Sequence, residues 1–342
     1  MKKVTIADIA RIAGVTKGTV SMVINNYSRI PGSTKDRIIK IMKENDYYPF
    51  ESAQNLGKGK NDVIAFMAVR FSAPFIAEIL EAFERKAIMS EKYVNGIMPY
   101  STRNDPKIRQ ELFRSILYGR KASCLVTLAI NPDPKMVAEY KKHSLPLILI
   151  ENSMKGAHSV NVDNFRGAFM AAEHLIKTGR KNIGLMSGGI DINTPWGLNP
   201  AAVERKAGFE AALKKHGRVL KAGYIEMVHR YTCAEGKELL DNFIKKRIKL
   251  DAVFCSAGDA MAMGVMERAR ELGMKIPGDL AVIGFDDMIF SAHLSPPLTT
   301  VRQPIEKLGF EAFDLAVVAI EGRLKKEKHI ILEPELIIRK ST

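Results

Sequence analysis

Residues 4–21 read VTIADIARIAGVTKGTVS, and this stretch decides the architecture of the amino-terminal part of the chain. Thr5, with Asp8 three positions later, forms a capping box, which satisfies free N–H groups at the start of a helix. From Ile6 onward, apolar residues recur at i, i+3, i+4 and i+7, which gives a helix with one apolar face. Gly14 then permits the backbone geometry of a helix end. The stretch therefore predicts two short helices separated by a tight turn.

A second and a third helix follow from the same reasoning. Thr16 is placed to cap the second helix, and Ser33-Thr34 opens the third. The residues expected to face inward from these two helices are Val20, Val23, Ile24, Ile38, Ile41 and Met42. Three such helices bury a small core and place the second to enter a DNA major groove. A generic three-helix bundle is the alternative that the spacing alone leaves open.

The charge of the chain is concentrated at its amino terminus. The formal net charge is +14, and 46% of the 342 residues are hydrophobic. Residues 1–60 contain eleven Lys or Arg and five Asp or Glu, which gives +6 and leaves +8 for residues 61–342. A high density of positive charge is what contact with DNA phosphates requires. A solvated basic face is sufficient to explain the excess in the remainder.

Composition also narrows the class of protein. A chain of 342 residues predicts two or three domains, with enough apolar content for a sizeable core. Cys124, Cys233 and Cys255 are far apart, which favours reduced thiols in a cytoplasmic protein. We find no leader-like apolar segment and no run long enough for a membrane span, so we expect no membrane partner. The seven histidines are scattered, and we expect neither a metal nor a cofactor.

From Asp62 onward, short apolar runs alternate with amphipathic stretches. The predicted strands are Val63–Val69, Tyr93–Met98, Cys124–Ala129, Leu147–Ile150, Ser159–Val162, Ile183–Met186, Ala252–Cys255 and Leu280–Phe285. The predicted helices include Phe75–Ala87, Arg166–Lys177, Ala201–Lys215 and Ala260–Leu272. This alternation is typical of parallel sheets covered by helices on both faces. There are too many strands for one compact sheet, so we expect two lobes.

The chain resembles the lactose-repressor (LacI/GalR) family of bacterial transcription regulators. In the amino-terminal part, the resemblance rests on Val4-Thr5-Ile6, Asp8-Ile9-Ala10, Ala13-Gly14-Val15, Thr19-Val20-Ser21, Asn25, Tyr48-Pro49, Ala53 and Leu56. Farther on, it rests on residues 161–164, 174–175, 204–209, 258–264, 276–287 and 295–301. These motifs are specific in combination, and they extend over nearly the whole chain.

The resemblance implies an α/β fold with a helix-turn-helix headpiece at 1–49, a hinge segment at 50–60 and a core at 61–342. The core is similar to type I periplasmic sugar-binding proteins, with two lobes and three crossings of the chain between them. The implied boundaries place residues 61–160 and 292–322 in lobe 1. Residues 161–291 and 323–342 then form lobe 2.

The resemblance also implies which residues read DNA, and two positions depart from the family pattern. The candidates are Thr5, Thr16, Lys17, Ser21, Met22, Asn25, Asn26, Arg29, Thr34, Ala53 and Leu56. Met22 stands where the family commonly has arginine; methionine cannot donate a hydrogen bond to guanine but can contact a thymine methyl group. Gly18 has no side chain to read a base, so Lys17 is the best candidate for a guanine edge. Arg29 and Thr34 fit phosphate contacts. Leu56 fits a wedge in the minor groove.

A ligand site is expected between the lobes, because open parallel sheets bind ligands at the carboxyl ends of their strands. The candidates are Phe75, Glu151, Asn152, Trp196, Arg205 and Asp259. By the resemblance, the Asp259 carboxylate accepts two hydroxyl groups of a sugar, and the Arg205 fork donates to the ligand. The alternatives are that Arg205 and Asp259 pair with each other or cap helices. The aromatic candidates could equally be packing residues.

These observations predict a sequence-specific DNA-binding regulator of transcription, a repressor that binds a near-palindromic operator as a homodimer. A small effector, most commonly a sugar in this family, controls it from the cleft. A solute-binding protein of a transport system is the alternative, and the basic headpiece speaks against it. An enzyme is not expected, because no phosphate-binding loop, nucleophile elbow or zinc-protease motif occurs. Asp286-Asp287 fits a loop cap better than a metal or acid–base site. The effector, the direction of its effect, and dimer against tetramer stay open.

Overall fold

A computed structural model describes residues 5–24, 30–45, 47, 63–94, 96–190 and 199–342. The chain divides into two compact units, residues 1–62 and residues 63–342. Within the described residues, no helix combines the length and the apolar character that a membrane crossing needs.

The first unit is a small bundle of helices. Its described helices are α1 (Ile6–Ile12), α2 (Lys17–Ile24) and α3 (Gly32–Glu44). The predicted capping box at the start of α1 is present: the Thr5 side chain accepts from the backbone N–H of Asp8, and the Asp8 side chain accepts from the backbone N–H of Thr5. Ile9, Val20 and Ile38 are fully buried at the centre of the bundle. The predicted inward face of each helix is thus confirmed.

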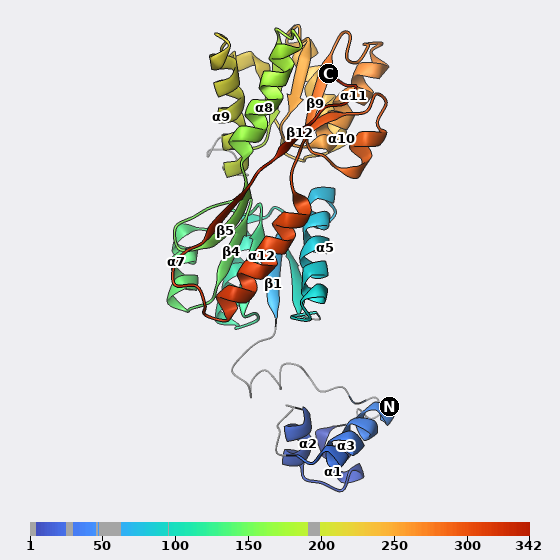
Figure 1. Ribbon diagram of the computed structural model, residues 1–342, viewed down its shortest axis with the longest axis vertical. Helices are drawn as coiled ribbons and strands as arrows, with labels where there is room; N and C mark the ends of the chain where they lie inside the picture. Colours follow the sequence, from blue (N-terminus) through green and yellow to red (C-terminus); the bar gives the residue numbers. More distant parts are fainter. Residues whose placement is uncertain (1–4, 25–29, 46, 48–62, 95, 191–198) are drawn as a thin grey trace. The chain divides into compact units, whose positions relative to one another are not determined.

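Lobe 1 of the second unit is built on a six-stranded parallel sheet with strand order β11-β5-β4-β3-β1-β2. Its strands are β1 (Ile64–Ala68), β2 (Ile97–Ser101), β3 (Cys124–Leu128), β4 (Leu147–Ile150), β5 (His158–Val162) and β11 (His329–Leu332). Helices α5 (Pro74–Met89) and α12 (Ile305–Ile320) cover one face. Helices α6 (Pro106–Tyr118) and α7 (Pro134–Lys142) cover the other (Figure 1).

Lobe 2 repeats this arrangement with strand order β12-β10-β9-β8-β6-β7, in which only β12 is antiparallel. Its strands are β6 (Ile183–Ser187), β7 (Ile225–Met227), β8 (Ala252–Cys255), β9 (Ala281–Asp286), β10 (Thr299–Arg302) and β12 (Glu335–Ile337). Helices α8 (Asn164–Lys177) and α9 (Pro200–Lys215) pack on one face. Helices α10 (Cys233–Lys245) and α11 (Asp259–Glu271) pack on the other.

The chain passes between the two sheets three times, after β5, β10 and β11, as Figure 1 shows. The number of crossings agrees with the expectation, but the expected boundaries are wrong in two places. Residues 299–302 were assigned to lobe 1, yet they form β10 of the lobe 2 sheet. Residues 329–332 were assigned to lobe 2, yet they form β11 of the lobe 1 sheet. Pairing partners, which the sequence pattern does not reveal, decide both assignments.

The central strands were predicted well and the edge strands poorly. In β1, β3 and β4 every residue is buried, and all of these residues except Thr127 of β3 are apolar. The edge strand β2 is half exposed, contains Pro99 and begins four residues later than predicted. The edge strands β7, β11 and β12 were not predicted, and neither was β10, which lies between β9 and β12. All four are three or four residues long and, unlike the equally short β4 and β8, each contains polar residues, so no apolar run marks them.

Glycines allow the helices on each sheet to approach closely. A Cβ atom on Gly208 of α9 would lie 2.1 Å from the carbonyl oxygen of Phe165 in α8. A Cβ atom on Gly264 of α11 would lie 1.9 Å from the carbonyl oxygen of Cys233 in α10. Any side chain at these positions must push the helix backbones apart.

We predict that Gly264→Ala lowers the free energy of unfolding of the core by about 1–3 kcal/mol, the usual cost of overpacking. This loss should exceed the roughly 0.5–1 kcal/mol that alanine gains over glycine within a helix. Denaturant unfolding of the full chain measures it, with Gly278→Ala as control because its Cβ would make only ordinary contacts. Equal stability of the two variants would contradict the close backbone packing of α10 and α11.

Candidate functional site

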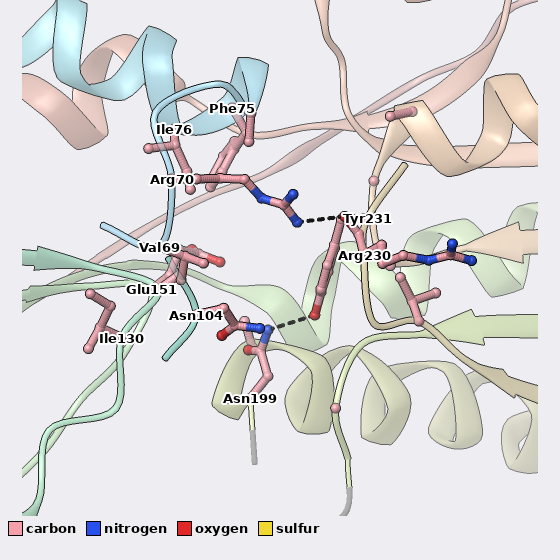
Figure 2. Close-up of a pocket in the computed structure, with 18 of the residues that line it drawn as sticks. Val69, Arg70, Phe75, Ile76, Asn104, Ile130, Glu151, Asn199, Arg230 and Tyr231 are labelled. Carbon is pink, nitrogen blue, oxygen red and sulfur yellow. Dashed lines mark hydrogen bonds between the residues drawn. The ribbon is translucent and has the colours of Figure 1, made fainter. Parts of the chain in front are cut away.

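A cavity of about 430 Å³ lies between the lobes of the second unit. Its walls include residues that follow strands of both sheets, such as Val69 directly after β1, Glu151 directly after β4 and Gly258 three residues after β8. This is the edge at which open parallel sheets bind ligands. The volume lies within the range of small-molecule sites. Figure 2 shows side chains of both lobes pointing into this space.

Arg205 on α9 is buried and connects the two lobes. Its Nε donates to Oδ1 of Asn164 at 2.7 Å, and Nη1 donates to the carbonyl oxygen of Ser256 at 2.8 Å. Nη2 donates to Oε2 of Glu151 in lobe 1 at 3.2 Å. The guanidinium carbon also lies 3.7 Å from the ring centroid of Phe285. These contacts fix the guanidinium in one orientation at the cavity wall, with N–H groups of Nη1 and Nη2 left for a ligand.

Glu151 is the lobe 1 partner of this arginine and lines the cavity. Burial raises the pKa of its carboxyl group, and the nearby Arg205 guanidinium opposes the rise. Its Oε2 binds Arg205, while Oε1 is buried without a hydrogen-bond partner among the described residues. An unsatisfied buried acceptor is costly, so this oxygen is placed for a donor that a ligand brings.

Asp259 does not have the position that was predicted for it. Its side chain is fully buried and does not line the cavity. The carboxylate accepts hydrogen bonds from the Met288 N–H at 2.8 Å, from the Ser291 hydroxyl at 2.6 Å and from the Thr300 hydroxyl at 2.6 Å. Three internal donors occupy its oxygens, so Asp259 ties the start of α11 to β10 and the loop after β9. The expected direct contact with a ligand is corrected accordingly.

Asp286 occupies the cavity wall instead, and the sequence argument did not select it for the ligand site. Its backbone φ of 114° is rare for a residue other than glycine. Gln303 Nε2 donates to its Oδ1 at 2.7 Å, and the Gln303 Oε1 is buried without a partner among the described residues. Burial raises the pKa of Asp286 to about 8 against the lowering effect of Arg205. Burial also raises the pKa of Asp259, to about 6, although its three hydrogen-bond donors oppose the rise.

The second acidic residue of this pair, Asp287, has a purely structural environment. Its carboxylate lies 2.7 Å from Nε of Arg302 and 2.7 Å from Nη2 of Arg339. No cluster of metal-ligating side chains occurs in the part of the chain that the structure describes. The structure therefore gives Asp287 ion pairs in place of the expected loop cap, while Asp286 faces the cavity.

The other predicted ligand residues are Phe75, Asn152 and Trp196. Phe75 lines the lobe 1 wall at the start of α5 (Figure 2). Asn152 lines the cavity, but its Nδ2 donates to the carbonyl oxygen of Ile130 at 3.1 Å and to Oδ1 of Asn131 at 2.7 Å, so it chiefly joins two loops. Trp196 lies outside the described residues.

Three further residues of the cavity were missed by the sequence argument. Tyr231, two residues before α10, projects across the cavity toward Asn199 (Figure 2). Arg70 follows β1, and Arg109 lies on the first turn of α6. The position of Arg70 directly after a predicted strand was an available signal. Nothing in the sequence pointed to Arg109, because a basic residue on a helix surface is common.

In the first unit, the structure places several predicted DNA contacts on the outer side of α2. Lys17 is exposed, and the Met22 side chain is 37% exposed. Thr16 has a structural role, since its Oγ1 accepts from the Thr19 N–H at 3.1 Å. Helix α2 carries no acidic residue, so nothing on it repels phosphate.

The remaining predicted DNA contacts divide by position. Ser21 and Thr34 are partly buried, and the exposed Thr5 is engaged in the cap of α1. The candidates that lie outside the described residues are Asn25, Asn26, Arg29, Ala53 and Leu56.

Comparison with known proteins agrees with the description of both units, the helical first unit and the two-lobed second unit. Residues 5–49 match the family model for bacterial regulatory proteins of the lacI family. Residues 172–342 match the model for a periplasmic binding protein-like domain. The HTH-type transcriptional regulator DegA of Bacillus subtilis is 32% identical, over 99% of this chain and 98% of DegA. The HTH-type transcriptional repressor PurR of Erwinia tasmaniensis is 30% identical, over 98% of this chain and 96% of PurR.

Solved structures show the same fold. A Lac repressor dimer bound to operator and the anti-inducer ONPF matches with a TM-score of 0.83 at 24% identity, over 100% of this chain and 99% of that one. The transcriptional regulator CelR in complex with cellobiose matches with a TM-score of 0.73 at 25% identity, over 99% of this chain and 100% of that one.

Fold and site together define a helix-turn-helix transcriptional regulator with a core of the periplasmic-binding-protein type. The chain belongs to the lacI family of bacterial regulatory proteins. It is therefore a DNA-binding protein and not an enzyme, as the sequence predicted.

We predict that Asp286→Asn stabilises the protein progressively as pH rises. Because the folded-state pKa is raised from 3.8 to about 8, the native protein binds the extra proton between these values. Its stability therefore falls through this window, by at most about 1.4 kcal/mol per pH unit. Asparagine does not ionise, so the advantage of the variant should grow up to pH of about 8 and then level off.

Denaturant unfolding at several pH values measures this difference. Asp314→Asn, which changes a half-exposed carboxylate on α12, is the control and should give no such trend. A constant difference between Asp286→Asn and the unchanged protein would mean that Asp286 is ionised in the native state.

Proposed function

We propose that this regulator is a cytoplasmic repressor that binds a near-palindromic operator as a homodimer and is controlled by a sugar or sugar-like effector in the interlobe cavity. The observation that carries the proposal is the buried contact between Arg205 of lobe 2 and Glu151 of lobe 1 at the cavity wall. A ligand that bonds to either group acts on both lobes at once. Such a ligand changes the balance between lobe arrangements if it favours one of them.

The proposed coupling is modest in size. Effectors typically change the affinity for a second ligand by a free energy of about 1–3 kcal/mol. The connection from β1 back to the headpiece is covalent, through residues 48–62, so a change of the lobes has a direct route to the DNA-binding unit.

A symmetric pair of headpieces explains why the operator would be near-palindromic. The Lac repressor, which shares this fold, is seen as a dimer on its operator.

The first test is selection of bound genomic fragments by the purified full-length protein at physiological salt. The proposal expects one near-palindromic motif, and it expects deletion of residues 1–60 to abolish its selection. Binding that is salt-sensitive but without a motif would overturn the operator assignment. Recovery of the same motif by the truncated chain would place DNA recognition in the core.

Lys17→Ala should relax sequence preference, because Lys17 is exposed at the start of α2 and fits a guanine edge. We expect the free-energy difference between operator and non-specific DNA to fall by about 1–3 kcal/mol. Lys40→Ala, an exposed lysine of α3 close to Glu44, is the matched control. Fluorescence anisotropy with both DNAs gives the ratio. If the two variants change this ratio equally, Lys17 contacts phosphate rather than a base.

Glu151→Gln should weaken effector binding about tenfold or more, since a hydrogen bond to a charged group contributes about 1.5–3 kcal/mol. Operator affinity without effector should change less. The effector for this test is the compound that most raises the unfolding temperature in a panel of sugars, sugar acids, sugar phosphates and purine bases. Glu111→Gln, an exposed carboxylate on α6, is the control. Unchanged affinity in Glu151→Gln would remove this residue from the effector site.

A further inference from the structure

Within the described residues, some of the charged side chains around the cavity form ion pairs and others do not. Arg205 is bound to Glu151, and the side chain of Arg230 is turned to Glu235 and Glu238 of α10. Neither Arg70 nor Arg109 forms an ion pair within the part of the chain that the structure describes. Both belong to lobe 1 and both line the cavity.

Arg70 lies at the opening between the lobes. Its Nη2 donates to the carbonyl oxygen of Arg230 in lobe 2 at 2.8 Å, which Figure 2 shows as a dashed line. An arginine has five N–H donors, so the Arg70 fork can still bind an anion on its other nitrogen atoms.

The same wall of lobe 1 presents free backbone donors. Helix α5 begins at Pro74 without a side-chain cap, and Phe75 and Ile76 also line the cavity. The N–H groups of Phe75 and Ile76 have no hydrogen-bond acceptor among the described residues. A helix amino terminus with open N–H groups favours an anion. Asp105 also lines this wall, but its carboxylate accepts from the N–H groups of Lys107 and Ile108 at the start of α6. The two arginines and the helix amino terminus therefore leave this wall with an excess of groups that attract negative charge.

The same cavity also contains buried hydrogen-bond acceptors. Oε1 of Glu151 and Oε1 of Gln303 are buried acceptors without a donor among the described residues, and both residues line the cavity. Their side chains are 5% and 2% exposed, respectively. Buried acceptors of this kind need hydroxyl or N–H groups from a ligand. The cavity thus combines buried hydrogen-bond acceptors with two arginines that form no ion pair among the described residues.

We propose that the effector is a small polyhydroxylated anion. Its carboxylate or phosphate lies against Arg70, Arg109 and the open N–H groups of α5, and its hydroxyl groups donate to Glu151 and Gln303. A neutral sugar would satisfy the acceptors but would leave the guanidinium groups without counter-charge. A purine base would supply donors and no charge. The inference rests on the proposed function, because it takes the cavity to be the effector site.

The test is calorimetric binding of matched sets of compounds to the full-length protein. Each set holds a neutral aldose, its aldonate, its uronate and its terminal phosphate, for several aldoses of five and six carbons. The expected result is that a charged member binds at least tenfold more tightly than its neutral parent. The preferred charged member distinguishes carboxylate from phosphate. A neutral member that binds as tightly as its acids, or no binding at millimolar concentration, would overturn the proposal.

The variant Arg109→Gln tests whether the anionic group of the effector binds at Arg109. It should lower the affinity for the charged member about tenfold, as the loss of a charge-assisted hydrogen bond predicts, and should leave the affinity of the neutral parent unchanged. Arg114→Gln on the same helix is the control, because its guanidinium lies over the Tyr118 ring and does not line the cavity. Equal losses for charged and neutral members in Arg109→Gln would assign Arg109 a structural role and overturn this placement of the anion.

Operator binding in the presence of the same compounds separates this inference from the proposed function. If charged members bind but do not change operator affinity, the regulatory role of the cavity fails and the ligand class stands. If only neutral sugars bind and they change operator affinity, the regulatory role stands and the ligand class is wrong. The Arg109→Gln variant also excludes simple competition of anions with DNA for the basic headpiece, because that effect would persist in the variant.

Discussion

The guanidinium of Arg205 is the contact on which the effector-binding core depends. It is buried, and it joins Asn164 at the start of α8, the carbonyl oxygen of Ser256 after β8 and the carboxylate of Glu151 in lobe 1. A buried charge is tolerated only when its donors are satisfied, because desolvation of an unpaired ion is costly. The same contacts that make Arg205 acceptable in the interior therefore fix the geometry of the cavity and link its two walls.

The placement of the acidic groups follows from this constraint. One guanidinium cannot balance several buried carboxylates, so each carboxyl group is stabilised in a different way. Glu151 pairs with Arg205, Asp259 takes three internal donors, and burial raises the pKa of Asp286 to about 8. The cavity therefore holds buried acceptors together with Arg70 and Arg109, which form no ion pair among the described residues. This combination is the basis for the inference about the effector.

Much of the fold was predictable, and the errors have a common cause. The capping box at Thr5 and the apolar runs of β3 and β4 are local patterns, and the structure has them where the sequence placed them. The boundaries of the lobes were wrong because they depend on whether residues 299–302 and 329–332 pair with one sheet or the other. Pairing is a long-range property, and a strand of four residues has no pattern that names its neighbour.

The sequence by itself determined the helices and strands, since capping and apolar periodicity are set by neighbouring residues, and its motifs indicated the class of protein through their resemblance to the lacI family. It also selected Arg205 and Glu151 from their positions in motifs and after strands. Only the tertiary structure decided that these two residues meet across the lobes and that Asp286, rather than Asp259, faces the cavity. Asp259 and Asp286 both belong to motifs that the sequence shows. Ser291 and Thr300 bind Asp259 and not Asp286 because of the way β9, β10 and α11 pack together.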